Sequence, residues 1–259
     1  MNIVVLVKQV PDSGAERTLN AGDNTVERGS ANNVINEMDE YAIEEALRIK
    51  EAHGGAVTVL TMGPERAAES IRKALSMGPD AAVHVIDDAL RGSCAVATSK
   101  VLAAALGTLS PDLVICGAES TDGRVQVMPH MLAERLGVAA LTGARKLTVD
   151  GSTLTAERQT EEGYEVVTAA TPAVVSVWDT INEPRYPSFK GIMAAKKKPV
   201  RTLSLADLGV PAEEVGFAGA TSAVVEFTKR PARSAGTKII DEGTAGTQLV
   251  EFLATEKFV

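Results

Sequence analysis

Aromatic side chains are scarce in this chain, because Phe, Trp and Tyr together make up 3% of its 259 residues, whereas hydrophobic residues make up 45%. The core must therefore be built from Val, Leu, Ile and Ala, which suit Val-rich parallel strands packed under Ala-rich helices. Charged residues amount to 23%, so the composition is that of an ordinary globular protein and excludes wholesale disorder.

Cysteine, histidine and net positive charge are also lacking. The two cysteines, Cys94 and Cys116, cannot build a disulfide framework, and neither they nor the three histidines show metal-site spacing. The 26 Lys and Arg residues face 34 Asp and Glu, and this net charge of −8 disfavours nucleic-acid binding. Without a signal peptide or an apolar run of about 18 residues, we expect a cytoplasmic chain with no direct membrane insertion.

The familiar signatures of enzymes are missing as well. Neither cysteine has a histidine nearby, and the motifs G-x-S-x-G and H-E-x-x-H are absent. The first strand is followed by no G-x-G-x-x-G, and the chain has no Walker A lysine, which excludes both common nucleotide fingerprints. We therefore expect no bond-making enzyme, no catalytic residue and no metal.

Short buried strands alternate with amphipathic helices in the first part of the chain. Continuous apolar runs predict strands at 2–7, 56–62, 81–86 and 112–116. Apolar residues at helical spacing predict a helix that Asn36 caps and residues 53–55 end, followed by helices at 65–77, 94–109 and 126–136. This alternation predicts an α/β fold, with a twisted parallel sheet and helices on both faces.

Strand patterns without helices follow. Runs at 146–149 and 153–158 flank an Asp-Gly turn, and further strands are predicted at 164–169 and 172–177. These strands predict an antiparallel extension of the sheet. The polar region 12–35 contains short alternating pieces that predict a hairpin.

The chain is expected to divide near residue 184. Residues 1–184 are predicted to form an α/β nucleotide-binding domain, and residues 185–259 a partner-recognition loop and a C-terminal arm. In segment 182–201 the apolar residues follow neither the helical nor the strand period. A strand is expected at 222–231 and a helix at 247–254. The last part has too few apolar residues per element to bury a core of its own, as is typical of an arm that packs on a partner.

One group of candidate site residues follows the predicted strands. Ligands of parallel sheets bind at the carboxyl ends of strands, near a switch in strand order. The turn 117–123 is small and polar, and the helix start after it suits a phosphate, whereas Leu6 and Met62 suit an adenine ring. An ordinary capped turn, and loops that merely share one rim, are the alternatives.

A second candidate is the stretch 185–201, which carries six basic side chains and no acid in a chain of net charge −8. Interleaved with these charges are the apolar side chains of Tyr186, Phe189, Ile192 and Met193. Apolar groups on a basic loop predict a docking surface for an acidic partner. A solvated face and RNA binding are the alternatives, and the acidity of the chain weighs against RNA.

The same stretch carries a family resemblance. The run VVSVWDTINEPRYPSFKGIMAAKKKPV resembles the long motif of electron transfer flavoprotein β subunits, with the core N-E-P-R-Y-P-x-x-x-x-I-M-x-A-K-K-K. Similar stretches are IVVLVKQVPDS, NEMDEYAIEEALRIKE, TMGPERAAESIRKALSMGPDAAVHV and DLVICGAESTDG. The resemblance therefore runs from the N-terminus through this motif, and it continues more weakly to the end.

The resemblance implies a fold of the adenine nucleotide α-hydrolase type and a heterodimer whose α subunit is wrapped by the C-terminal arm. It implies an electron carrier of fatty acid oxidation that accepts electrons from acyl-CoA dehydrogenases and other dehydrogenases. A membrane quinone oxidoreductase then receives these electrons. The redox FAD lies mainly on the α subunit, and the β subunit buries a structural AMP.

Two other functions stay open beside this one. In the electron-bifurcating subgroup of the family, a second and redox-active FAD takes the place of AMP. A stand-alone nucleotide-binding protein of the same fold is disfavoured, because the chain has the family motif with its predicted docking surface and a long C-terminal arm.

Carried over by position, the AMP pocket of the family falls on Leu6, Asn36, Glu37, Met38, Asp39, Met62, Gly117, Ala118, Glu119, Ser120, Thr121, Asp122, Gly123, Arg124, Val125, Gln126, Val127 and Met128. The partner-recognition loop falls on Arg185, Tyr186, Phe189, Ile192, Met193, Lys196, Lys197 and Lys198. Phe189 matches the apolar residue that inserts into the dehydrogenase. The chain departs from the family at Val125–Pro129, where members often carry Gln-Thr-Gly or Gln-Val-Gly.

Overall fold

The computed structural model describes residues 1–29, 32–233 and 235–259, and it forms two units, Met1–Val225 (unit 1) and Glu226–Val259 (unit 2). The strands are β1 (Asn2–Leu6), β2 (Gln9–Pro11), β3 (Asn33–Ile35), β4 (Ala56–Met62), β5 (Ala81–Val85), β6 (Leu113–Gly117), β7 (Ala139–Asp150), β8 (Thr153–Gln159), β9 (Tyr164–Ala170), β10 (Ala173–Val177) and β11 (Val200–Leu203). The helices are α1 (Glu37–His53), α2 (Ala68–Met77), α3 (Ala95–Leu109), α4 (Met128–Leu136), α5 (Phe189–Ala195), α6 (Leu205–Leu208) and α7 (Ala245–Thr255). Short 3₁₀ helices are η1 (Glu65–Ala67), η2 (Asp88–Leu90) and η3 (Ala212–Glu214).

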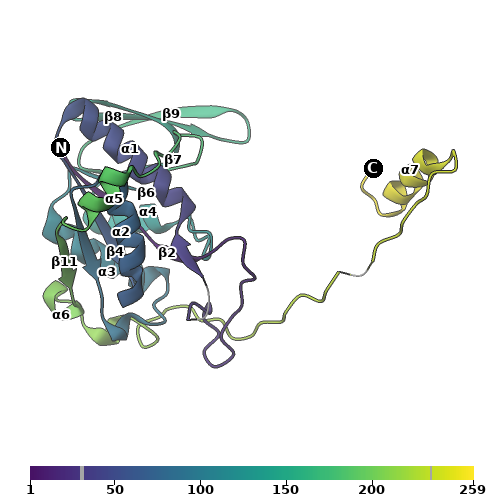
Figure 1. The fold of residues 1–259 in the computed structure, drawn as a ribbon, viewed down its shortest axis with the longest axis horizontal. Helices are drawn as coiled ribbons and strands as arrows, with labels where there is room; N and C mark the ends of the chain where they lie inside the picture. Colours follow the sequence, from purple (N-terminus) through teal and green to yellow (C-terminus); the bar gives the residue numbers. More distant parts are fainter. Residues whose placement is uncertain (30–31, 234) are drawn as a thin grey trace. The chain divides into compact units, whose positions relative to one another are not determined.

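One large sheet organises unit 1 (Figure 1). Nine strands of the described chain form it, in the order β11-β5-β4-β1-β6-β10-β7-β8-β9. All neighbours from β11 to β7 are parallel, and β8 and β9 continue the sheet as antiparallel strands. The predicted α/β class, with a parallel sheet and an antiparallel extension, is confirmed.

Two separate cores cover the two faces of this sheet. Ile3 and Val5 of β1 enter the core that α1 and α2 cover, whereas Val4 and Leu6 enter the core that α3 and α4 cover. Central strands are thus buried on both faces, which explains why they read as continuous apolar runs rather than as alternation. The prediction of helices on both faces is confirmed.

The polar region after β1 forms the predicted hairpin. The antiparallel strands β2 and β3 pair at its base, and an antiparallel bridge between Leu19 and Val26 lies farther along it. At its base, Val10 and Ile35 are buried, and farther out the hairpin is fastened to the rest of unit 1 by polar contacts. Arg17 donates to the Thr121 carbonyl, and Arg91 Nη2 lies 2.5 Å from Asp23 Oδ2.

Unit 1 runs past the boundary predicted at residue 184. The edge strand β11 pairs in parallel with β5 and buries Leu203 in the core beneath α3, and the segment after it buries Leu205, Val210 and Val215 in the same core. The sequence did not predict β11, because Leu203 is its one buried residue and the strand shows no alternation of apolar and polar side chains. The strand expected at 222–231 is not formed; this segment is coil, and Val225 is 92% exposed.

Unit 2 contains α7, which confirms the helix expected near the C-terminus. None of its described residues is buried, and Leu249, Val250 and Phe252 are exposed. An isolated helix of this length is marginal in water, so a partner surface over these apolar side chains would stabilise α7. Among the described residues, no helix has both the length and the apolar character needed to cross a membrane.

We predict that Gly117→Ala destabilises unit 1 by about 1–3 kcal/mol, the usual cost of overpacking. Gly117 ends β6 beside the start of α1, and an added Cβ would lie 2.5 Å from Met38 Cβ and 2.8 Å from Asp39 Oδ1. Relief would therefore need a shift of the α1 backbone. Urea unfolding measures this change in the free energy of unfolding.

The matched control is Gly107→Ala, in α3. A Cβ at Gly107 meets no atom within 4 Å, and alanine forms helices better than glycine by about 1 kcal/mol. This control should be neutral or slightly stabilising. Equal free energies of unfolding for the two variants would contradict the close contact between β6 and α1.

Candidate functional site

The strand order brings the predicted rim segments together. β1 lies between β4 and β6, so the chain leaves β1 toward one side of the sheet and later returns to its other side. Such a reversal opens a crevice at the carboxyl ends of the strands. The ends of β1, β4 and β6, which carry Leu6, Met62 and Gly117, face this crevice as expected.

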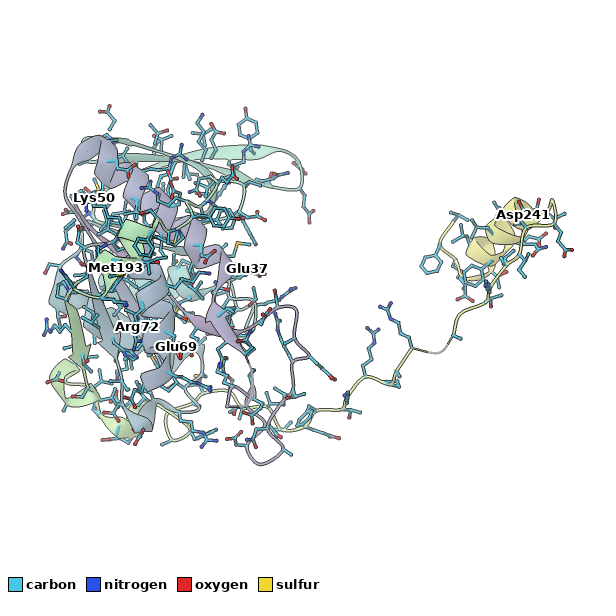
Figure 2. All side chains as sticks on the ribbon, viewed as in Figure 1. Glu37, Lys50, Glu69, Arg72, Met193 and Asp241 are labelled. Carbon is cyan, nitrogen blue, oxygen red and sulfur yellow. The ribbon has the colours of Figure 1, made fainter. Side chains whose placement is uncertain are left out.

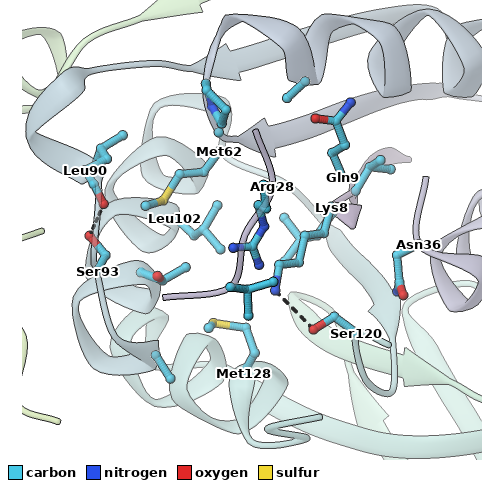
Figure 3. Close-up of a pocket in the computed structure, with 18 of the residues that line it drawn as sticks. Lys8, Gln9, Arg28, Asn36, Met62, Leu90, Ser93, Leu102, Ser120 and Met128 are labelled. Atoms are coloured by element: carbon cyan, nitrogen blue, oxygen red, sulfur yellow. Dashed lines mark hydrogen bonds between the residues drawn. The ribbon is translucent and has the colours of Figure 1, made fainter. Parts of the chain in front are cut away.

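The crevice encloses a cavity of about 1130 Å³ (Figure 3). Many of the residues predicted for the nucleotide line it, namely Leu6, Asn36, Asp39, Met62, Gly117, Ala118, Glu119, Ser120, Val125, Gln126 and Met128. The other predicted residues do not line it, and these are Glu37, Met38, Thr121, Asp122, Gly123, Arg124 and Val127. Asp122 lies behind the lining, since its side chain is fully buried.

Asn36 occupies the N-cap position of α1, but its side chain makes no capping hydrogen bond. Its Nδ2 donates instead to Asp39 Oδ1 at 2.9 Å and to the Glu119 carbonyl at 3.0 Å. Its Oδ1 accepts a hydrogen bond from the Thr121 backbone N–H at 3.0 Å. Asn36 therefore fastens the turn after β6 to the start of α1.

The helix after this turn begins later than the sequence predicts. Arg124 and Gln126 have φ angles of 49° and 56°, in the left-handed region, so α4 begins at Met128 rather than at Gln126. Pro129 then stands in the first turn of the helix, where its missing N–H costs no hydrogen bond. The predicted phosphate-binding helix start is thus separated from the turn 117–123.

The sequence reading missed two segments that line the cavity. One is the hairpin, which contributes Asn20, Thr25, Val26, Glu27, Arg28 and Gly29, and the other runs from Ile86 to Leu102 through η2 and the start of α3. No pattern in the hairpin pointed to the site, whereas the second segment begins at the end of the predicted strand 81–86, and that strand end was a usable signal. Lys8 also lines the cavity, and its place directly after β1 was a usable signal.

A buried carboxylate links two cations beside the cavity. Lys8 Nζ lies 2.7 Å from Asp122 Oδ1, and Arg28 forms an ion pair with the other oxygen of this carboxylate. Burial alone would raise the pKa of Asp122, but Lys8, Arg28 and a hydrogen bond from Ser120 lower it to about 2. The carboxylate is thus charged at neutral pH and holds both cations in place.

Asp39 behaves in the opposite way. Its carboxyl accepts hydrogen bonds from the Lys8 backbone N–H at 2.7 Å and from Asn36 Nδ2 at 2.9 Å. Burial nevertheless dominates and raises the pKa of Asp39 to about 7. A neutral carboxyl therefore stands at the cavity wall below this pH.

The basic segment 185–198 is anchored to α1 and α2. The Arg185 guanidinium bonds Glu44 at 2.7 Å and Glu51 at 2.6 Å, and these two carboxylates raise its pKa. Farther along, Lys198 Nζ donates to the Leu75 carbonyl at 2.9 Å. Arg185 and Lys198, predicted for partner recognition, thus make intramolecular contacts that fix the segment.

Other predicted recognition residues of this segment are exposed, among them Met193 on α5, which Figure 2 labels. Tyr186 is 94% exposed and Phe189 80% exposed, whereas Ile192 and Met193 on α5 are about half exposed. Lys196 and Lys197 are exposed as well. Gly191 lets α5 approach α2 closely, since an added Cβ would lie 2.5 Å from the Ser76 carbonyl oxygen.

We predict that Asp39→Asn removes part of the pH dependence of stability. Between about pH 4 and 7, only the folded chain protonates Asp39, so this group's contribution to stability declines as the pH rises and is lost above its folded pKa. From pH 5 to 8, the free energy of unfolding of the parent should fall relative to the variant by on the order of 2–3 kcal/mol. Denaturant melts at several pH values measure this difference.

Asp122→Asn is the control for this titration. The pKa of Asp122 is lowered, so its contribution to stability is present above the ordinary carboxyl pKa and is lost only in acid. Its difference from the parent should stay constant between pH 5 and 8. A pH-independent difference for Asp39→Asn would refute the raised pKa.

Comparisons with known proteins show which family the chain is similar to. The family model described as "Electron transfer flavoprotein domain" matches residues 23–208. The chain is 52% identical to the electron transfer flavoprotein subunit beta of Mycobacterium tuberculosis (strain ATCC 25618 / H37Rv) and 53% identical to that of Mycobacterium leprae (strain TN), over 100% of this chain and 99% of each relative. With the protein of the same name from Clostridium acetobutylicum, identity is 35% over 100% of both chains.

The matched residues 23–208 contain every strand of the large sheet except β1, most of the cavity-lining segments and the basic segment 185–198, so the similarity covers both candidate regions of unit 1. The resemblance inferred from the sequence motif is therefore confirmed over the whole length. The chain belongs to the electron transfer flavoprotein family and groups with its β subunits.

Proposed function

We propose that this chain is the β subunit of a heterodimeric electron transfer flavoprotein in the cytoplasm, an electron carrier rather than an enzyme. Its electrons come from acyl-CoA dehydrogenases and other dehydrogenases and pass to a membrane quinone oxidoreductase. The observation that carries this proposal is the full-length similarity to proteins named electron transfer flavoprotein subunit beta. FAD, held mainly by the α subunit, supplies the redox chemistry when bound.

The cavity supports a structural AMP in this chain. Met62, Leu102 and Met128 supply apolar side chains for a base, and Lys8 and Arg28 supply positive charge for a phosphate (Figure 3). Small-molecule sites combine an apolar lining with a few placed polar groups in this way. The nucleotide would join the hairpin, the turn after β6 and the start of α3, and thereby stabilise unit 1.

A second candidate function is the electron-bifurcating form of the family, with a second FAD in the same cavity. The observation that favours it is size, because about 1130 Å³ lies above the roughly 300–1,000 Å³ of common ligand sites. A dinucleotide would use more of this volume than AMP. The two functions therefore differ in what the cavity holds.

Flavin and AMP content of the heterodimer tests both functions. For the proposed function we predict one flavin and one AMP per heterodimer, and no visible absorbance from this chain alone, because the redox FAD lies mainly on the α subunit. Absorption spectra and chromatography of the extracted nucleotides give the counts. Two flavins without AMP, or a yellow preparation of this chain alone, would reject the first function in favour of the second.

Two surfaces support the partner proposals. The anchored segment 185–198 presents Phe189 amid basic side chains, which suits an acidic dehydrogenase with an apolar pocket. α7 exposes apolar side chains without a core, which suits an arm that wraps the α subunit. In the proposed complex, the arm holds the heterodimer together and the loop receives the electron donor.

We predict that Phe189→Ala slows electron transfer from an acyl-CoA dehydrogenase by about tenfold or more. Aromatic anchors commonly contribute about 2 kcal/mol to binding, and about 1.4 kcal/mol corresponds to a factor of ten. Since Phe189 is 80% exposed, its removal should leave thermal stability and flavin content unchanged. Dehydrogenase-coupled flavin reduction at subsaturating concentration measures the effect.

Tyr164→Ala, which removes a 60% exposed ring from β9, is the matched control and should leave the rate unchanged. The docking role fails if Phe189→Ala transfers electrons at the parental rate. It also fails if this variant loses thermal stability and all assays decline together.

A further inference from the structure

We propose that Lys8 and Arg28 form the anion-binding end of the cavity and hold the phosphate of a nucleoside monophosphate. The inference rests on the proposed function, which places a nucleotide in this cavity, and it assigns two residues that neither the motif nor the rim argument singled out for the phosphate. It also makes the hairpin between β2 and β3 part of the binding site, because Arg28 comes from this hairpin.

The charges of this cluster do not balance. Lys8 and Arg28 share the single carboxylate of Asp122, so two positive charges face one negative charge. Lys8 and Arg28 line the cavity with side chains that are 44% and 32% exposed, whereas Asp122 is fully buried behind them. The excess positive charge is thus presented to the cavity and the compensating negative charge is not.

Polar groups next to the cluster suit a phosphate. Lys8 Nζ also lies 3.2 Å from Ser120 Oγ, so a hydroxyl stands beside the cations (Figure 3). Phosphate oxygens accept charge-assisted hydrogen bonds from ammonium and guanidinium groups more strongly than neutral acceptors do. Because Asp122 already orients both cations, a ligand would not have to order them.

Three of the carboxylates that also line the cavity accept hydrogen bonds from partners of their own. Glu119 Oε2 accepts from Gln126 Nε2 at 2.6 Å, and Asp87 Oδ1 accepts from the Ala89 backbone N–H at 3.0 Å. Glu27 Oε1 accepts from the Gly29 backbone N–H at 2.5 Å. Lys8 and Arg28, which share one buried carboxylate, are therefore well placed to bind an anionic group of the ligand.

The test compares AMP with adenosine, which differ in the phosphate. Titration calorimetry of the full chain, freed of bound nucleotide, should show AMP binding at least tenfold more tightly than adenosine, with a preference that weakens as NaCl screens the charges. Arg28→Gln should weaken AMP binding by about tenfold and change adenosine binding less than twofold. Lys8→Gln should act in the same direction, and Arg28→Lys should keep most of the preference.

Arg72→Gln, which removes the same charge from the exposed face of α2, is the control and should change neither affinity (Figure 2). If the parent binds both ligands and Arg28→Gln leaves their affinity ratio unchanged, the assignment of the phosphate is overturned while the nucleotide cavity stands. If the parent binds neither AMP nor adenosine, the proposed AMP function fails as well. Circular dichroism of each variant confirms that unit 1 is folded.

Discussion

The placement of β1 between β4 and β6 is the constraint on which the site depends. Because the chain leaves β1 toward one edge and returns on the other, the loops after β1 and β6 diverge and cannot cover the gap between them. The backbone at this gap still needs hydrogen-bond partners, and buried Asn36 and Asp39 provide them for the turn after β6 and for Lys8. The crevice and its polar lining therefore have one topological origin.

Much of the fold could be predicted from the sequence, because central parallel strands are buried on both faces and leave continuous apolar runs. β11 left no such trace, since one buried side chain, Leu203, holds it at the sheet edge. The start of α4 was also hidden, because the left-handed conformations of Arg124 and Gln126 depend on the turn they complete rather than on helix preference. Local patterns report burial well and report individual backbone angles poorly.

The residues of the candidate site were likewise predictable only where a local pattern marks them. Leu6, Met62 and Gly117 could be predicted because strand ends of a parallel sheet converge. Arg28 could not, because it reaches the cavity from a hairpin whose position is set by ion pairs and single polar contacts. In the basic segment, the sequence shows how many charges there are but not which side chains face the protein. The structure shows that Arg185 contacts Glu44 and Lys198 contacts the Leu75 carbonyl, whereas Phe189 is exposed.

The clamp of Arg185 on Glu44 and Glu51 has an entropic consequence. Fixing the backbone of one residue costs roughly 1–2 kcal/mol, and in segment 185–198 this cost falls on folding rather than on association. In the docking proposed above, a surface that is already ordered would meet its partner with a smaller entropy loss, so a small contact around one aromatic ring would be enough for recognition. In the proposed carrier, which must also release each partner, order built into the subunit would allow complexes that are specific and short-lived.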